Sequence, residues 1–69
     1  MNKFKIEISS VPDRENLVAE IWYNEILVAE INQETEKLEI EFYLDKKIAF
    51  ELADFLETLV IAKRKIMTE

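Results

Sequence analysis

The chain has 69 residues, of which 49% are hydrophobic and 35% are charged, and its formal net charge is −6. This length is enough for one domain, so we expect a single domain over residues 1–69. Cysteine and histidine are both missing, which excludes disulfides, thiol chemistry and the usual ligands of a zinc site. The function must therefore come from other side chains.

The negative charge is concentrated in the middle of the chain. Residues 7–45 hold eleven acidic and two basic residues, a net charge of −9, against +3 for the remainder. Direct binding to a nucleic-acid backbone requires clusters of lysine and arginine, so it is not expected. A protein partner of basic character is expected instead.

No stretch of the sequence predicts a membrane segment or a leader. There is no run of about 18 apolar residues that could cross a bilayer. The first residues run into alternating apolar and charged positions and not into a continuous apolar segment. We therefore expect a cytoplasmic protein with no membrane contact.

Four stretches alternate between apolar and polar residues, a pattern typical of half-buried antiparallel strands. They cover residues 3–9, 17–23, 26–32 and 37–44. Residues 10–16 are polar and contain the lone proline, Pro12, so they predict a loop.

The second and third stretches share the string Leu-Val-Ala-Glu-Ile, at residues 17–21 and 27–31, which suggests two similar arms of a hairpin. The favoured register has a loop over residues 23–25, with Asn24 in the left-handed conformation. A shift by two residues would set Glu20 opposite Glu30, and two like charges in that position are unfavourable. The favoured pairs are Leu17–Ile31, Ala19–Ala29 and Ile21–Leu27.

The apolar period changes to that of a helix after residue 45, which predicts a helix over residues 46–67 with Asp45 as its N-cap. The fold class expected is α+β: a four-stranded antiparallel meander with one C-terminal helix packed on one face, in the order ββββα. The predicted apolar stripe of the helix contains Ile48, Leu52, Phe55, Leu56, Leu59, Ala62 and Ile66.

Catalytic chemistry has little support. The only serines are Ser9 and Ser10, and there is no glycine-rich phosphate loop. The pairs Glu39/Glu41 and residues 34/36 could serve acid–base chemistry, but carboxylates two apart on a strand are typical of a solvated face. The turn at residues 32–36 lacks the spaced ligands and glycine of a calcium loop. We expect no enzyme activity, no cofactor and no metal.

The sheet face turned away from the helix is the predicted working surface. Its apolar residues, which include Val18 and Ile26, are ringed by carboxylates, as in an interface with an apolar centre and a polar rim. The alternative is an ordinary solvated face with scattered apolar residues. A second surface, at Phe50 and Ile61 on the far side of the helix, would suit a homodimer. The predicted partner-binding residues are Glu20, Trp22, Val28, Glu30, Glu39, Glu41 and Tyr43.

The string SSVPDRENLVAEIWY at residues 9–23, followed by residues 29–34 and 38–43, resembles a group of short uncharacterised bacterial proteins, cyanobacterial ones among them. The resemblance covers about the first two-thirds of the chain. It implies a bacterial or phage origin and no activity.

Two hypotheses for the function remain. The first is a small acidic protein-binding module, an inhibitor of nucleic-acid-handling machinery of the nucleic-acid-mimic type, as in phage or mobile-element counter-defence. The second is a structural or regulatory subunit, such as an antitoxin or a dimeric accessory protein.

Overall fold

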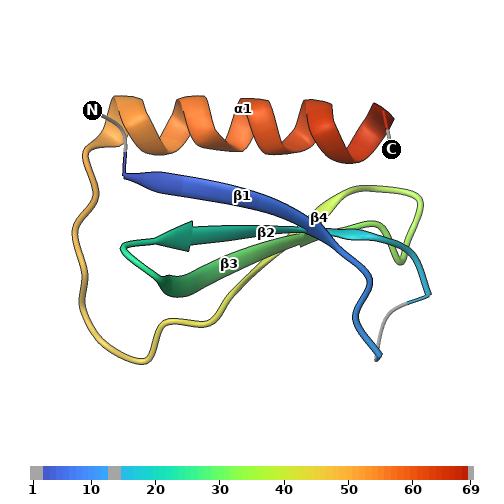
Figure 1. The fold of residues 1–69 in the computed structure, drawn as a ribbon, viewed down its shortest axis with the longest axis horizontal. Helices are drawn as coiled ribbons and strands as arrows, with labels where there is room; N and C mark the ends of the chain where they lie inside the picture. The colour runs from blue at the N-terminus through green and yellow to red at the C-terminus, as the bar shows by residue number, and fades with distance from the viewer. Residues whose placement is uncertain (1–2, 13–14, 69) are drawn as a thin grey trace.

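The computed structural model of the protein describes residues 3–12 and 15–68. The described residues form one antiparallel sheet, with neighbouring strands in chain order, and one helix that lies across a single face of it (Figure 1). The predicted α+β fold, a four-stranded meander with a C-terminal helix, is confirmed. The elements are β1 (Phe4–Ser9), β2 (Val18–Tyr23), β3 (Ile26–Asn32), β4 (Glu39–Phe42) and α1 (Leu52–Thr68).

The core lies between α1 and the two central strands. We name the sheet face toward the helix the inner face. Every second side chain of β2 and β3 points to it, and these side chains are small or branched. Ala62 and Ile66 of α1 pack against them, and the alanines let the helix approach the sheet closely. Burying one isoleucine side chain contributes about 1.5–3 kcal/mol. The buried inner-face residues are Ala19, Ile21, Ala29 and Ile31.

The turn between β2 and β3 differs from the predicted one. It has two residues, Asn24 and Glu25, with φ angles of 47° and 66°. The left-handed conformation of Asn24 is confirmed, and the three-residue loop over 23–25 is wrong. Two left-handed residues in succession form the turn whose twist matches that of the flanking strands, which accounts for its preference.

The register of this hairpin is also the one that the sequence disfavoured. Glu20 lies opposite Glu30, and the pairing shifts by one residue between Ile21 and Trp22, where Val28 is the extra residue. Without this bulge, the two-residue turn would turn Glu30 toward the helix, because a slip of one residue moves every side chain to the other face. The bulge therefore keeps the apolar side chains in the core, and it brings two carboxylates together.

The helix begins at Leu52 and not at residue 46. Glu51 caps it: Oε2 accepts a hydrogen bond from the amide of Ala53 at 3.2 Å and Oε1 one from the amide of Asp54 at 3.0 Å. The predicted cap, Asp45, is outside the helix. An earlier start would place Lys46 and Lys47 at the positive end of the helix dipole, where cations are unfavourable.

Residues 43–51 run around one end of the sheet to reach the start of α1 (Figure 1). They bring Phe50 into a cluster of aromatic rings with Phe4, Tyr23 and Phe55, whose centroids lie 4.8–5.7 Å apart. Tilted and edge-on pairs at such distances are favourable. Phe50 therefore precedes the helix and packs in this cluster, so it cannot share a helical face with Ile61, as the predicted dimer seam requires.

The predicted apolar stripe of the helix divides into two parts. Phe55, Ala62 and Ile66 turn toward the sheet, whereas Leu52 and Leu56 are 67% and 52% exposed. Only part of the stripe is buried, because α1 packs over β1 and β2 and leaves one of its flanks outside that contact.

Candidate functional site

Four glutamates, one from each strand, form a straight row across the sheet. The pairings set Glu7 opposite Glu20, Glu20 opposite Glu30, and Glu30 opposite Glu41. All four lie on the outer face, the side of the sheet away from α1. With strands about 4.8 Å apart, the row is about 14 Å long. We call these four residues the glutamate row.

Side chains of the same face hold two carboxylates of the row in place. The hydroxyl of Ser9 donates to Oε1 of Glu20 at 3.1 Å, and the indole Nε1 of Trp22 donates to the same oxygen at 3.4 Å. The hydroxyl of Tyr43 donates to Oε1 of Glu30 at 3.0 Å. These bonds are charge-assisted, and so they orient the carboxylates while the aromatic rings stay beside them.

One end of the row carries an ion pair. Nζ of Lys5 lies 2.9 Å from Oε1 of Glu7, with 72% and 43% of the two side chains exposed. The hydrogen bond and the charge of Glu7 raise the pKa of Lys5. Lys5 lies opposite Trp22 on β2, and its ion pair with Glu7 runs along β1.

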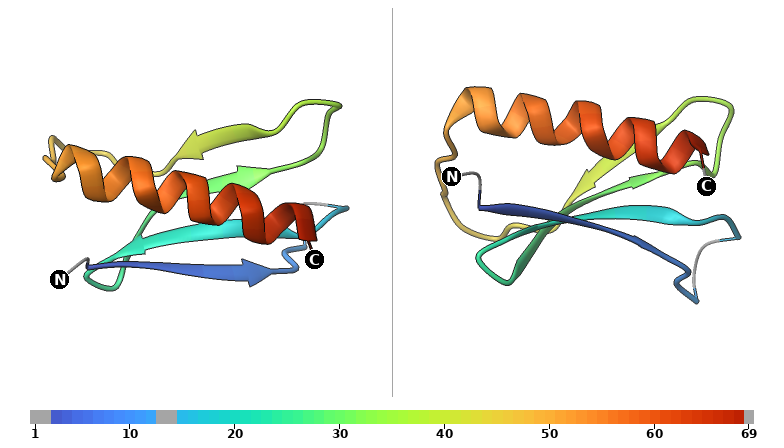
Figure 2. Two further views of the ribbon diagram at one scale, coloured as in Figure 1. Left: turned by 90° about the horizontal axis from the view of Figure 1, so that it is seen from above. Right: turned by 45° about the horizontal axis from the view of Figure 1, so that its top comes forward.

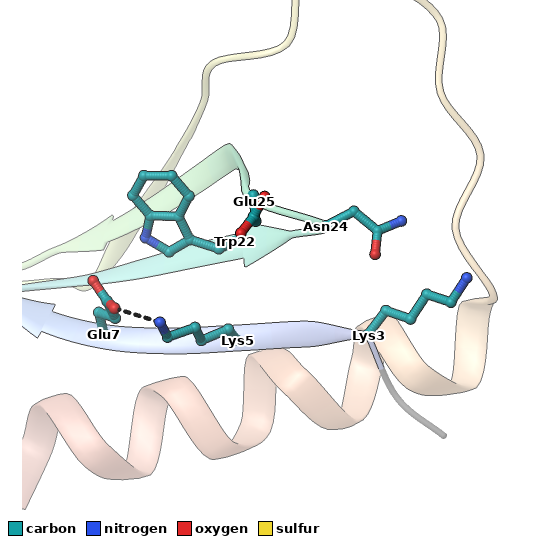
Figure 3. A pocket seen from close by; sticks show the side chains of 6 residues that line it. All are labelled: Lys3, Lys5, Glu7, Trp22, Asn24 and Glu25. Atoms are coloured by element: carbon teal, nitrogen blue, oxygen red, sulfur yellow. Dashed lines mark ion pairs between the residues drawn. The ribbon is translucent and has the colours of Figure 1, made fainter.

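Trp22 stands on the outer face beside a hollow of about 430 Å³ (Figure 3). Its ring projects from β2 on the side opposite the helix and is half-buried. The walls carry charges of both signs, with Lys5 and Glu7 bonded to one another (Figure 3). The hollow is lined by Lys3, Lys5, Glu7, Trp22, Asn24 and Glu25.

The predicted partner-binding residues are only partly accessible. Val28 has no exposed surface and Glu30 is 5% exposed, so the expectation that they lie open to a partner is wrong. Val18, expected among the apolar residues of the same face, is also fully buried. The amide of Tyr43 donates to the carbonyl of Val28 at 3.0 Å, which places the tyrosine directly beside it. Long side chains of the same face thus cover the small apolar ones.

The remaining predicted residues do reach solvent. Glu39, Glu41 and Tyr43 are exposed, and Glu20 and Trp22 are half-buried. Glu7 was not among the predicted residues, although it completes the row. The alternating pattern of β1 predicts the face on which Glu7 lies. Only the register between β1 and β2 shows that Glu7 is opposite Glu20.

Asn32, also on the outer face, is 1% exposed, and neither polar atom of its amide has a hydrogen-bond partner among the described residues. Burying an unsatisfied amide costs about 1–3 kcal/mol. Within residues 3–12 and 15–68, no group of three or more acidic side chains is arranged to hold a metal ion. In the same part of the chain, no helix is long and apolar enough to cross a membrane.

Comparison of the chain with protein-family models, curated proteins and solved structures gives no match. The function is therefore inferred from the geometry of the molecule.

Proposed function

We propose that this protein is a non-enzymatic binding module that captures a basic segment of another protein on the outer face of its sheet. The alignment of the glutamate row carries this proposal. Three of its carboxylates reach solvent, and Trp22 and Tyr43 stand on the same face.

The row is costly for the fold. Each like-charged pair directly opposite on neighbouring strands destabilises by about 0.2–1 kcal/mol, so three pairs cost roughly 1–3 kcal/mol. A small domain without disulfides has a stability of only a few kcal/mol. Proteins break local rules of this kind mainly at functional sites. The cost supports a role in binding for the row.

The chemistry of the face fits arginine. A guanidinium group binds carboxylates through a planar fork of donors and stacks on aromatic rings, whereas an ammonium group does neither as well. The ring of Trp22 lies next to the carboxylates of Glu20 and Glu7. One arginine could therefore stack on the indole and bond to the row.

The finer form of the proposal is an inhibitor that mimics nucleic acid. The row presents one carboxylate about every 4.8 Å. This spacing is comparable to the charge spacing along a nucleic-acid strand, about 3.4 Å. A groove that binds a phosphate backbone would accept such a row. The second candidate, a structural or regulatory subunit, is favoured by apolar side chains left exposed on α1 and β4.

The test uses an arginine-rich peptide and the fluorescence of Trp22, which is the single tryptophan of the chain. At low salt, we expect the double variant Glu20→Gln/Glu41→Gln to bind about tenfold more weakly than the wild type. The control, Glu36→Gln/Glu57→Gln, has the same net charge and should bind within about twofold of the wild type. Equal losses in both variants would show that only net charge matters and would refute the proposed site.

A further inference from the structure

The helix leaves part of the inner face uncovered. It packs on β1 and β2, and β4 lies beside it and not beneath it (Figure 2, left). Large apolar side chains of β4 and of the adjacent flank of α1 are therefore exposed, between 38% and 67% each. We name these residues the α1–β4 apolar face: Ile40, Phe42, Leu52, Leu56 and Val60.

The strand and the helix contribute to one continuous surface. A groove of about 310 Å³ runs between them. Its walls are formed by Leu38 and Ile40, at and just before β4, and by Leu59 of α1. The rings of Phe42 and Phe55 lie 6.5 Å apart across the same gap. Leu56 and Leu52 lie one helical turn before Leu59 and Phe55, so they are on the flank of α1 that borders this groove.

The helical part of the α1–β4 apolar face is a regular ridge. Leu52, Leu56 and Val60 are spaced by four residues, and such residues lie one above another on a helix. Ridges of this spacing pack against an equivalent ridge on a second helix. Leu56 is at the centre of the ridge.

The total surface is large for the mass of the chain. It measures 5175 Å², whereas a monomeric protein of 8.2 kDa exposes about 4,500 Å². The radius of gyration, 11.8 Å, also exceeds the roughly 11 Å typical of 69 residues. The excess of about 600 Å² approaches the roughly 800 Å² that each partner buries in a standard interface.

The net charge of −6 opposes association of two copies, so the apolar area of the contact and the charges around it decide whether the chain can pair with itself. The groove is also lined by Glu39 and Lys63, which carry opposite charges. Around a two-fold axis the groove of one copy meets the groove of the other, and its two opposite charges add no net repulsion at the contact.

Pairing through the edge of the sheet is less favourable than packing through this face. The edge strand β4 has four residues, and two of them are Glu39 and Glu41. Short edge strands with charged side chains resist edge-to-edge pairing. The apolar face beside the strand has no comparable barrier.

We propose that two copies of this chain associate through the α1–β4 apolar face, related by a two-fold axis near Leu56. The glutamate rows stay outside this interface, on the opposite side of each sheet. The proposal does not depend on the proposed function.

Sedimentation equilibrium of the full chain tests the proposal. We expect twice the chain mass of 8.2 kDa at micromolar concentrations. Leu56→Glu should raise the dissociation constant by at least about 100-fold, because it places a charge in a desolvated apolar contact. Val60→Glu, at a residue 54% exposed, is a second variant, and circular dichroism checks that each retains its helix.

The matched control is Lys65→Glu. Residue 65 is exposed and lies nine positions from Leu56, on the opposite side of α1. Lys65→Glu makes the net charge more negative than Leu56→Glu does, and it should leave the dimer intact. A wild type that stays monomeric at about 100 μM would overturn the proposal and assign the face to a different protein. A dimer that persists in both glutamate variants would overturn the assigned surface.

Discussion

Replacing Glu30 with glutamine should make the protein more stable. Glu30 is 5% exposed and lies between Glu20 and Glu41. Neutralising it removes two like-charge contacts, each about 0.2–1 kcal/mol, and a buried amide costs less than a buried carboxylate. Against this, the bond from Tyr43, 3.0 Å long, becomes neutral and weaker by about 1 kcal/mol. The net gain should be about 1 kcal/mol, or roughly 4–8 °C in Tm for a domain of this size.

Thermal unfolding monitored by circular dichroism measures this gain, and Glu36→Gln on an exposed loop is the control. The control should change stability by less than about 0.5 kcal/mol. A double-mutant cycle with Glu20→Gln isolates the coupling between the two carboxylates, which should be repulsive. A lower Tm for Glu30→Gln, or an attractive coupling, would refute the reasoning that the row is held at a cost.

Three further changes test the fold. Glu25→Gly should stabilise by about 0.5–1 kcal/mol, because residue 25 has a φ of 66° that glycine adopts without strain; a loss of stability in urea unfolding would contradict the turn. Glu51→Ala should cost about 0.5–2 kcal/mol by removing the cap of α1, and an unchanged unfolding midpoint would contradict the cap. Ile66→Ala should cost about 2–5 kcal/mol of unfolding free energy. Leu56→Ala, at a residue 52% exposed, should cost much less when unfolding is measured at concentrations where the chain is monomeric. Equal losses would contradict the division of the apolar stripe into a buried and an exposed part.

Periodicity was sufficient to predict the four strands, the helix and their order, because alternation and helical spacing are local properties of the chain. The start of the helix was not predictable in this way. Glu51 caps the helix, and glutamate is an uncommon N-cap residue. Phe50 lies outside the helix because it packs in the aromatic cluster, which is a contact between distant parts of the chain.

The register of the hairpin failed for a physical reason. Repulsion between Glu20 and Glu30 argued against the observed pairing, and this repulsion is smaller than the gain from a favourable two-residue turn and a fully apolar inner face. The same pairing creates the glutamate row. The pairing that the sequence disfavours therefore lies at the candidate site, where local rules are most often broken.

The lateral position of the helix could not be read from the sequence either. An apolar stripe shows that a residue such as Leu56 favours burial, but not which strand or which chain buries it. Phe42, opposite Ala29, is likewise on the inner face and yet is 56% exposed. In the proposed dimer, both residues become buried, as the pattern indicates.

Binding of a basic segment by the outer face is tested most directly by mapping the binding surface by NMR. A chain of 69 residues gives a well-resolved amide spectrum, and an arginine-rich peptide can be added at increasing concentrations. If the outer face binds the peptide, the shifts should cluster at the indole of Trp22, at Tyr43 and along the glutamate row, and they should fade as salt is raised. Shifts that centre on α1, or that spread over every acidic residue alike, would contradict binding by the outer face.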